Sequence, residues 1–156
     1  MKIRKFKKKD TLSCADLIRK TYLKFNGSEY FNESAAKNYA EFFNTKSQSF
    51  KKIYSKFSES QIFFVAIQND DIIGLIRGKK NKISNLFVDS EYHKKGIGNK
   101  LIKKFESEAI KLKFKEIKIK SSVYALPFYQ KQNYKKTEGL INHQGLKAYP
   151  MKKILI

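Results

Sequence analysis

The sequence predicts one domain of mixed α/β class: an antiparallel group of strands, then a central strand, a glycine-containing loop, a helix and a parallel crossover strand. Three observations predict this class. Apolar runs of strand length recur between residues 62 and 88, separated by short polar turns. Apolar residues at helical spacing follow at 97–112, and an alternating segment follows at 116–120. Because no repeat or linker divides the chain, we expect a single domain over residues 1–156.

The first elements expected are a strand at residues 2–6 and a helix that runs to about Lys24. Asp10 precedes the helical pattern and is a suitable N-cap residue. Cys14 lies on the apolar face of this helix, and as the only cysteine it excludes an intramolecular disulfide. We therefore interpret Cys14 as a buried apolar residue rather than a nucleophile.

An aromatic segment follows and is less periodic. We expect a helix over about 33–44 and a turn or short helix over 50–57. No chemistry is evident in this segment. Two interpretations are open: a flank packed on the core, or part of a binding pocket.

The middle of the chain predicts the sheet. Strands at 62–67, 72–78 and 83–88 are separated by the turns at 69–71 and 81–82, which indicates an antiparallel meander. The helix expected at 96–111 separates this meander from the strand at 116–120, so the crossover is expected to be right-handed and the pairing parallel. A short helix at 124–132 and two final strands, 134–137 and 146–155, complete the domain, with a loop at 138–145.

The charge of the chain is strongly positive, at +20. Lysine supplies nearly all of it and is spread along the chain, which is typical of a generally solvated basic surface. The alternative is a surface that attracts an anionic partner, nucleic acid included.

No apolar run has the ~20 residues needed to span a bilayer, and no signal-peptide pattern opens the chain. We expect a cytoplasmic protein that does not bind membranes.

The segment from Ile83 to Leu101 combines a strand, a loop with two lysines and two glycines, and a helix start. The first N–H groups of a helix lack internal partners, and the helix dipole favours negative charge there. Glycine also lets an anion approach the backbone closely. The segment therefore predicts an anion site, most naturally for a phosphate group.

Two motifs in the chain resemble those of the GNAT superfamily of N-acetyltransferases. Leu86-Phe87-Val88 and the loop from His93 to Gly98 match the family's Leu-x-Val strand and its Gln/Arg-x-x-Gly-x-Gly/Ala loop, with His93 at the Gln/Arg position. The segment from Ser122 to Tyr134 is similar to a second family motif, in which Ser122 replaces the usual Asn and Asn133-Tyr134 replace Gly-Phe.

The resemblance implies a fold, a reaction and a site. It implies a GNAT-like domain that transfers an acetyl group from acetyl-CoA to a primary amine of a small molecule or protein, by direct attack in a ternary complex and without a metal. The pyrophosphate would bind the loop, and the pantetheine would add along the edge of the preceding strand, where an N–H polarises the thioester carbonyl. Tyr129 would be the general acid. The implied acetyl-CoA-binding residues are Leu86, Phe87, Val88, Lys94, Lys95, Gly96, Ile97, Gly98, Asn99 and Ser122.

Several points stay open at this level. Glu33, Glu41 and His143 are candidates for a general base, each weighed against an ordinary surface or loop residue, and proton loss through water needs none of them. The acceptor is not identified, and the chain could be a monomer or a homodimer. The alternative function is a non-catalytic basic module that binds nucleic acid or another polyanion.

Overall fold

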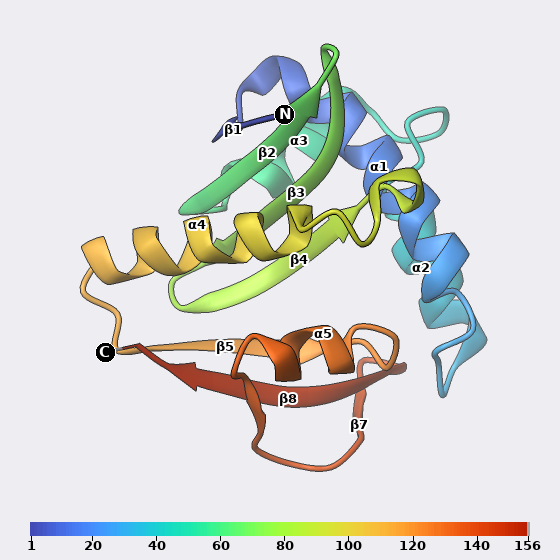
Figure 1. Ribbon diagram of the computed structural model, residues 1–156. Coiled ribbons are helices and arrows are strands. Elements are labelled where there is room, and N and C mark those ends of the chain that lie inside the picture. Colours follow the sequence, from blue (N-terminus) through green and yellow to red (C-terminus); the bar gives the residue numbers. More distant parts are fainter. Residues whose placement is uncertain (156) are drawn as a thin grey trace.

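The computed structural model describes residues 1–155, in which one sheet of eight strands has helices against both of its faces (Figure 1). The strand order is β1-β2-β3-β4-β5-β8-β6, and β7 pairs with β8 outside this path. The strands are β1 (Lys2–Lys5), β2 (Ile62–Gln68), β3 (Asp71–Lys79), β4 (Lys82–Val88), β5 (Glu116–Ser121), β6 (Lys135–Lys136), β7 (Ile141–His143) and β8 (Leu146–Ile154).

The helices lie where the sequence predicts them. They are α1 (Thr11–Phe25), α2 (Glu33–Phe42), α3 (Phe50–Ser58), α4 (Ile97–Lys111) and α5 (Leu126–Lys131), with 3₁₀ turns at Lys8–Asp10 and Ser90–Tyr92. Asn133 follows α5 with a φ of 69°, the left-handed conformation expected where this helix ends. None of the helices within residues 1–155 is long and apolar enough to cross a membrane.

Strand β2 shows why the sheet is covered on both faces. Ile62, Phe64 and Ala66 pack in one core with residues of α4 and α5, because alternate side chains of a strand point to the same face. Phe63 and Val65 pack in a second core with residues of α1 and α3. The continuous apolar run of β2 is therefore a strand between two helical layers, as predicted.

The predicted parallel crossover is confirmed, but its pairing is short. Strands β4 and β5 pair only through Lys82 with Lys118 and Ile83 with Ile119. Beyond Ile83 the two strands separate, and Figure 1 shows β4 rising away from β5. The register between β3 and β4 shifts at the same place, which leaves Ser84 as the extra residue of a β-bulge. The edge of β4 after the bulge is therefore not paired to β5.

Two expectations need correction. Asp10 stands at the N-cap position of α1, as predicted, but its carboxylate forms no capping hydrogen bond with the helix; it accepts hydrogen bonds from the Lys7 N–H at 2.8 Å and from both Arg4 Nη atoms at 2.7 and 3.0 Å. Asp10 thus closes the turn before α1 and holds β1 to it. The segment 138–145 is not only a loop, because residues 141–143 form β7 and turn into β8 at Gly145, whose φ is 94°. Cys14 is fully buried, as expected.

Candidate active site

A cavity of about 1610 Å³ opens where β4 and β5 separate. Its walls come from all five helices, including the N-terminus of α4, and from the strands β3, β4, β5, β7 and β8. Ligand pockets for one small molecule commonly measure roughly 300–1,000 Å³. This cavity therefore has room for two substrates that meet beside β4.

Strand β4 supplies one wall of the cavity and an unpaired edge. Leu86, Phe87 and Val88, the strand residues predicted to bind acetyl-CoA, all line the cavity. Leu86 and Val88 also pack on the core under α4, whereas Phe87 packs on the opposite face toward α1. Both faces of β4 are therefore held by cores, and the free edge between them is rigid.

The loop after β4 presents the N-terminus of α4 to the same cavity. Gly96 precedes the helix with a φ of 79°, and Lys94 also has a positive φ, of 61°. The N–H groups of Ile97, Gly98 and Asn99 have no intrahelical acceptor, because they belong to the first turn. Ile97 buries its side chain in the core, so only its backbone faces a ligand. This geometry is a general anion site.

The two glycines of the loop serve different purposes. At Gly96 a Cβ would meet nothing within 4 Å, so glycine is favoured there by its left-handed conformation alone. At Gly98 a Cβ would lie 3.2 Å from Cε1 of Phe128 on α5. Gly98 thus lets α5 pack closely on α4, a packing role that the sequence did not predict.

His93 has a specific role in the loop that sequence reasoning missed. Its Nε2 lies 2.7 Å from the carbonyl oxygen of Val88, at the end of β4. Its ring stacks on Phe25 of α1 with centroids 5.0 Å apart, and Phe25 stacks in turn on Tyr124 at 4.5 Å. His93 therefore connects β4, α1 and the segment before α5 rather than lying free on the surface.

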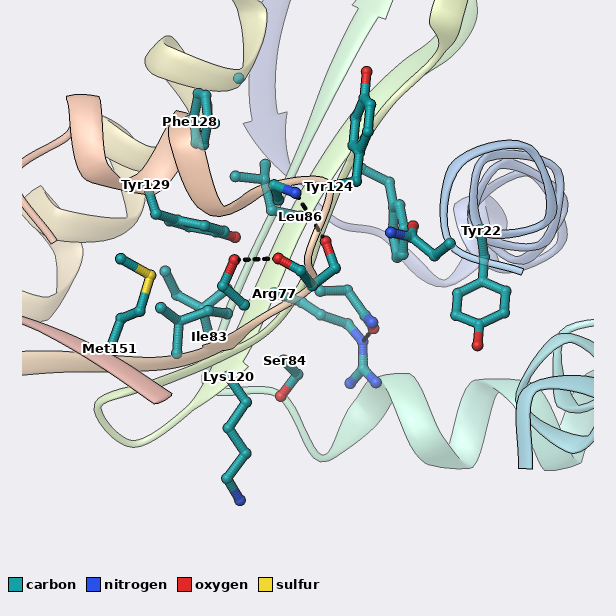
Figure 2. A pocket seen from close by; sticks show the side chains of 18 of the residues that line it. Tyr22, Arg77, Ile83, Ser84, Leu86, Lys120, Tyr124, Phe128, Tyr129 and Met151 are labelled. Atoms are coloured by element: carbon teal, nitrogen blue, oxygen red, sulfur yellow. Dashed lines mark hydrogen bonds between the residues drawn. The ribbon is translucent and has the colours of Figure 1, made fainter. Parts of the chain in front are cut away.

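Tyr129 lies in the cavity wall on α5, as a general acid requires. Its side chain is 4% exposed, and Figure 2 shows the hydroxyl end directed among the lining side chains, with Phe128 above it and Ile83 and Met151 below. Burial raises the pKa of the hydroxyl, and no hydrogen-bond partner for it lies among residues 1–155. The hydroxyl is therefore protonated at neutral pH and free to donate to a ligand.

The remaining predicted residues fall into two groups. Lys94, Asn99 and Ser122 line the cavity, and Ser122 Oγ accepts the Ala125 N–H at 3.1 Å, which fixes the chain just before α5. The Asn99 Oδ1 is buried and has no partner within residues 1–155. Lys95 lies outside the cavity wall, with its Nζ 5.5 Å from the ring centroid of Tyr92.

The structure separates the candidates for a general base. Glu33 pairs with Lys37 on the surface, and Glu41 accepts hydrogen bonds from Ser47 and Asn44; neither lines the cavity. His143 does line it, and burial, with a smaller effect of Lys120, lowers the pKa of its imidazole. Its neutral form, which can accept a proton, is therefore favoured at neutral pH.

Further polar residues in the wall were not predicted. Glu29 accepts the N–H groups of Val123 and Tyr124 at 3.0 and 2.9 Å, and so positions the segment before α5. Arg77 is buried on β3 and bonded to Asn85 of β4. The signal for Arg77 was present in the sequence as a charge within the apolar run of residues 72–78. Glu29 carried no such signal, because its partners lie more than 90 positions away.

A strand with a free edge, a helix N-terminus and a buried tyrosine thus line one cavity, an arrangement suited to an acyl-CoA-dependent transferase. A profile of the acetyltransferase (GNAT) domain matches residues 28–155. The chain therefore belongs to the GNAT acetyltransferase family and is an acyl-CoA N-acetyltransferase.

Solved structures share the fold over nearly the whole chain. A GCN5-related N-acetyltransferase from Rhodopseudomonas palustris has a TM-score of 0.81 and 18% identity, covering 99% of this chain and 95% of its own. The PaiA N-acetyltransferase from Thermoplasma acidophilum, solved with coenzyme A, has a TM-score of 0.75 and 21% identity, with 98% of each chain covered. The aminoglycoside 6'-N-acetyltransferase from Enterococcus faecium has a TM-score of 0.67 and 20% identity, covering 100% of this chain and 98% of its own.

Proposed function

We propose that the protein transfers the acetyl group of acetyl-CoA to a primary amine of a small molecule or protein by direct attack in a ternary complex. One observation carries the proposal: the free edge of β4, the N-terminus of α4 and the Tyr129 hydroxyl all face one cavity. The size of the cavity supports simultaneous occupation by both substrates.

The residues present fit acetyl-CoA. The first N–H groups of α4 and the charge of Lys94 suit a pyrophosphate, because charge-assisted hydrogen bonds to phosphate are short and strong. The unpaired edge of β4 at residues 86–88 offers backbone donors and acceptors to the amide groups of pantetheine. His93 already contacts the carbonyl oxygen of Val88, so this oxygen is not available to the ligand. The ligand therefore leaves the edge of β4 at Val88 and turns toward the loop.

The thioester supplies the acetyl group, and side chains of this protein donate and accept the protons of the reaction. As the amine nitrogen bonds to the carbonyl carbon, the carbon–sulfur bond breaks and the Tyr129 hydroxyl gives its proton to the departing sulfur. Burial raises the pKa of Tyr129, so the phenolate left behind is a strong base and recovers the proton that the amine loses through water. Neutral His143 is a second acceptor for that proton in the same cavity.

No specific observation favours the nucleic-acid-binding alternative. Several aromatic side chains pack against one another in the core, as in the stacked pair Phe6 and Phe63 at 4.1 Å and the edge contact of Phe57 with Phe63 at 5.3 Å. Single-strand binders place aromatics along an open groove where bases stack on them.

The test combines binding and turnover. Acetyl-CoA at 100 times its dissociation constant is expected to add about 2.7 kcal/mol to the free energy of unfolding, measured by thermal or urea unfolding. Release of free CoA thiol is then followed with a panel of primary amines. Absence of stabilisation by both acetyl-CoA and CoA would overturn the proposal, and so would binding without acetylation of any amine class.

A further inference from the structure

Arg77 is a buried cation in the wall of the cavity. It lies on β3 with 5% of its surface exposed, on the face of the sheet that packs against α1 and α3. Its Nε donates to Asn85 Oδ1 at 2.7 Å and its Nη1 donates to Ser60 Oγ at 3.1 Å. Its Cζ lies 5.2 Å from the ring centroid of Phe57 on α3.

None of these partners carries a negative charge. Within residues 1–155 no carboxylate forms an ion pair with Arg77; the exposed Glu59, which also lines the cavity, acts on it only as a nearby charge. Burial lowers the pKa of the guanidinium more than the nearby Tyr39, Glu59 and Cys14 raise it. Buried charges in proteins are normally paired. The buried guanidinium therefore has no hydrogen-bonded anion among residues 1–155.

The guanidinium is also held in a fixed orientation. Asn85 donates from Nδ2 to Tyr39 Oη at 2.7 Å, and this bond turns the Asn85 Oδ1 toward Arg77. A guanidinium carries five N–H donors, and the contacts above use two of them. The remaining donors form the planar fork that binds a carboxylate in bidentate fashion.

The surroundings favour an anion at this place. Four lysines of β3, β4 and β5 also line the cavity, namely Lys79, Lys82, Lys118 and Lys120, and they outnumber its three glutamates, Glu29, Glu59 and Glu116. Figure 2 shows Lys120 and Ser84 in the same part of the view as Arg77, while Tyr129 enters from α5. The side chain of Arg77 projects from the face of the sheet that is opposite α4. It is therefore on the other face of the sheet from the helix whose N-terminus suits the pyrophosphate.

We propose that Arg77 binds a carboxylate of the acceptor, so that the substrate class is an amine that also carries a carboxylate. The inference rests on the proposed acetyl transfer and deepens it. It also distinguishes this protein from transferases of polycationic amines, because a cavity wall in which Arg77 and the lysines outnumber the glutamates repels a polycation.

The first test compares matched acceptors that differ only in the carboxylate. The ω-amino acids β-alanine, γ-aminobutyrate and δ-aminovalerate are paired with the amino alcohols of the same length, and kcat/KM is measured for each. A preference of about tenfold or more for the amino acid is expected in at least one pair, because a charge-assisted hydrogen bond is roughly twice as strong as a neutral one. Equal values in every pair, or a preference for polyamines, would overturn the proposal.

The second test changes the guanidinium. Arg77→Met, which fills similar space beside Phe57, and Arg77→Lys, which keeps the charge without the fork, are expected to remove most of the preference for the amino acid by raising its KM. Lys51→Met on the surface of α3 is the matched control, because it removes one charge outside the cavity wall. Arg77 variants that still bind CoA and keep the preference would contradict the assignment.

Binding alone distinguishes failure of this inference from failure of the proposed function. Calorimetry of the wild-type complex with CoA measures the dissociation constants of δ-aminovalerate and of its amino alcohol without any turnover. Tighter binding of the amino acid by about tenfold, as above, supports the carboxylate site even if no acetyl transfer occurs. Equal affinities overturn it even if acetyl transfer to some amine is found. Inorganic phosphate that displaces neither compound is consistent with a carboxylate site, and tighter binding of phosphate than of the amino acid counts against it.

Discussion

The imidazole Nε2 of His93 lies 2.7 Å from the carbonyl oxygen of Val88, and this contact joins the end of β4 to the loop before α4. The loop therefore has a defined position relative to the strand before any ligand arrives. In the proposed function the two parts bind different portions of one long molecule, acetyl-CoA, so their spacing matters for affinity.

Replacing His93 tests whether this contact organises the site. His93→Ala is expected to weaken CoA binding roughly fivefold, since one hydrogen bond contributes about 1 kcal/mol, and calorimetry measures the change. His93→Gln restores an amide donor of the kind found at this position in the family motif and is the matched control. Equal CoA affinity in all three proteins would show that His93 is not needed for the loop.

Replacing Tyr129 by Phe removes the candidate acid and little else. Turnover is expected to fall by about 100-fold or more, the usual contribution of general acid catalysis, with nearly unchanged affinity for acetyl-CoA. The fold should not be weakened, because the hydroxyl has no partner among residues 1–155.

The control for this variant is Tyr134→Phe. Its hydroxyl donates to Glu106 Oε2 at 2.8 Å, outside the cavity wall. This change is expected to cost about 1.5–3 kcal/mol of stability and to leave turnover intact. Full activity of Tyr129→Phe would remove Tyr129 from the mechanism.

Enlarging Gly98 tests the packing of α5 on α4. A Cβ there would lie 3.2 Å from Phe128, so Gly98→Val should displace the helix that carries Tyr129. We expect a loss of about 1–3 kcal/mol of stability, typical of overpacking, with lower turnover. Phe128→Ala should partly rescue Gly98→Val in a double-mutant cycle measured by urea unfolding. Strictly additive effects would mean that the two residues do not interact.

The ionisation of Asp10 should make the stability of the protein depend on pH in the acid range. Burial disfavours its charge, but the bonds from Arg4 and the Lys7 N–H outweigh this and lower its pKa. A carboxylate with a lowered folded-state pKa stabilises the protein above its unfolded-state pKa of about 3.9, and loses that contribution as the pH falls through the folded-state value.

Asp10→Asn isolates this contribution. Because the Asp10 side chain is 5% exposed, the variant is expected to lose about 2–3 kcal/mol at neutral pH. The difference from the wild type should shrink below about pH 4. Urea unfolding across this range checks both points, and Asp71→Asn, at the exposed start of β3, is the control. A constant difference at every pH would exclude the ion pair as its cause.

Local patterns predicted most of the elements because the relevant forces act between near neighbours. The period-2 and period-3.6 patterns located β2, β3, β4 and α4 within one or two residues. Turn chemistry was less informative. The segment 138–145 contains β7, whose pairing with β8 is stabilised by Gly145 and by contacts of Phe31 and Asn32 with the Gly145 carbonyl at 2.8 and 3.0 Å.

The sequence by itself determined the strand, the glycine loop and the helix N-terminus that we propose bind acetyl-CoA, because these three elements are contiguous in the chain. The tertiary structure decided the other walls of the cavity, because these walls are built from residues that are far apart in the chain. Glu29 meets Val123 and Tyr124, and Arg77 meets Ser60 and, through Asn85, Tyr39. Only the separation of β4 from β5 turns these contacts into one cavity.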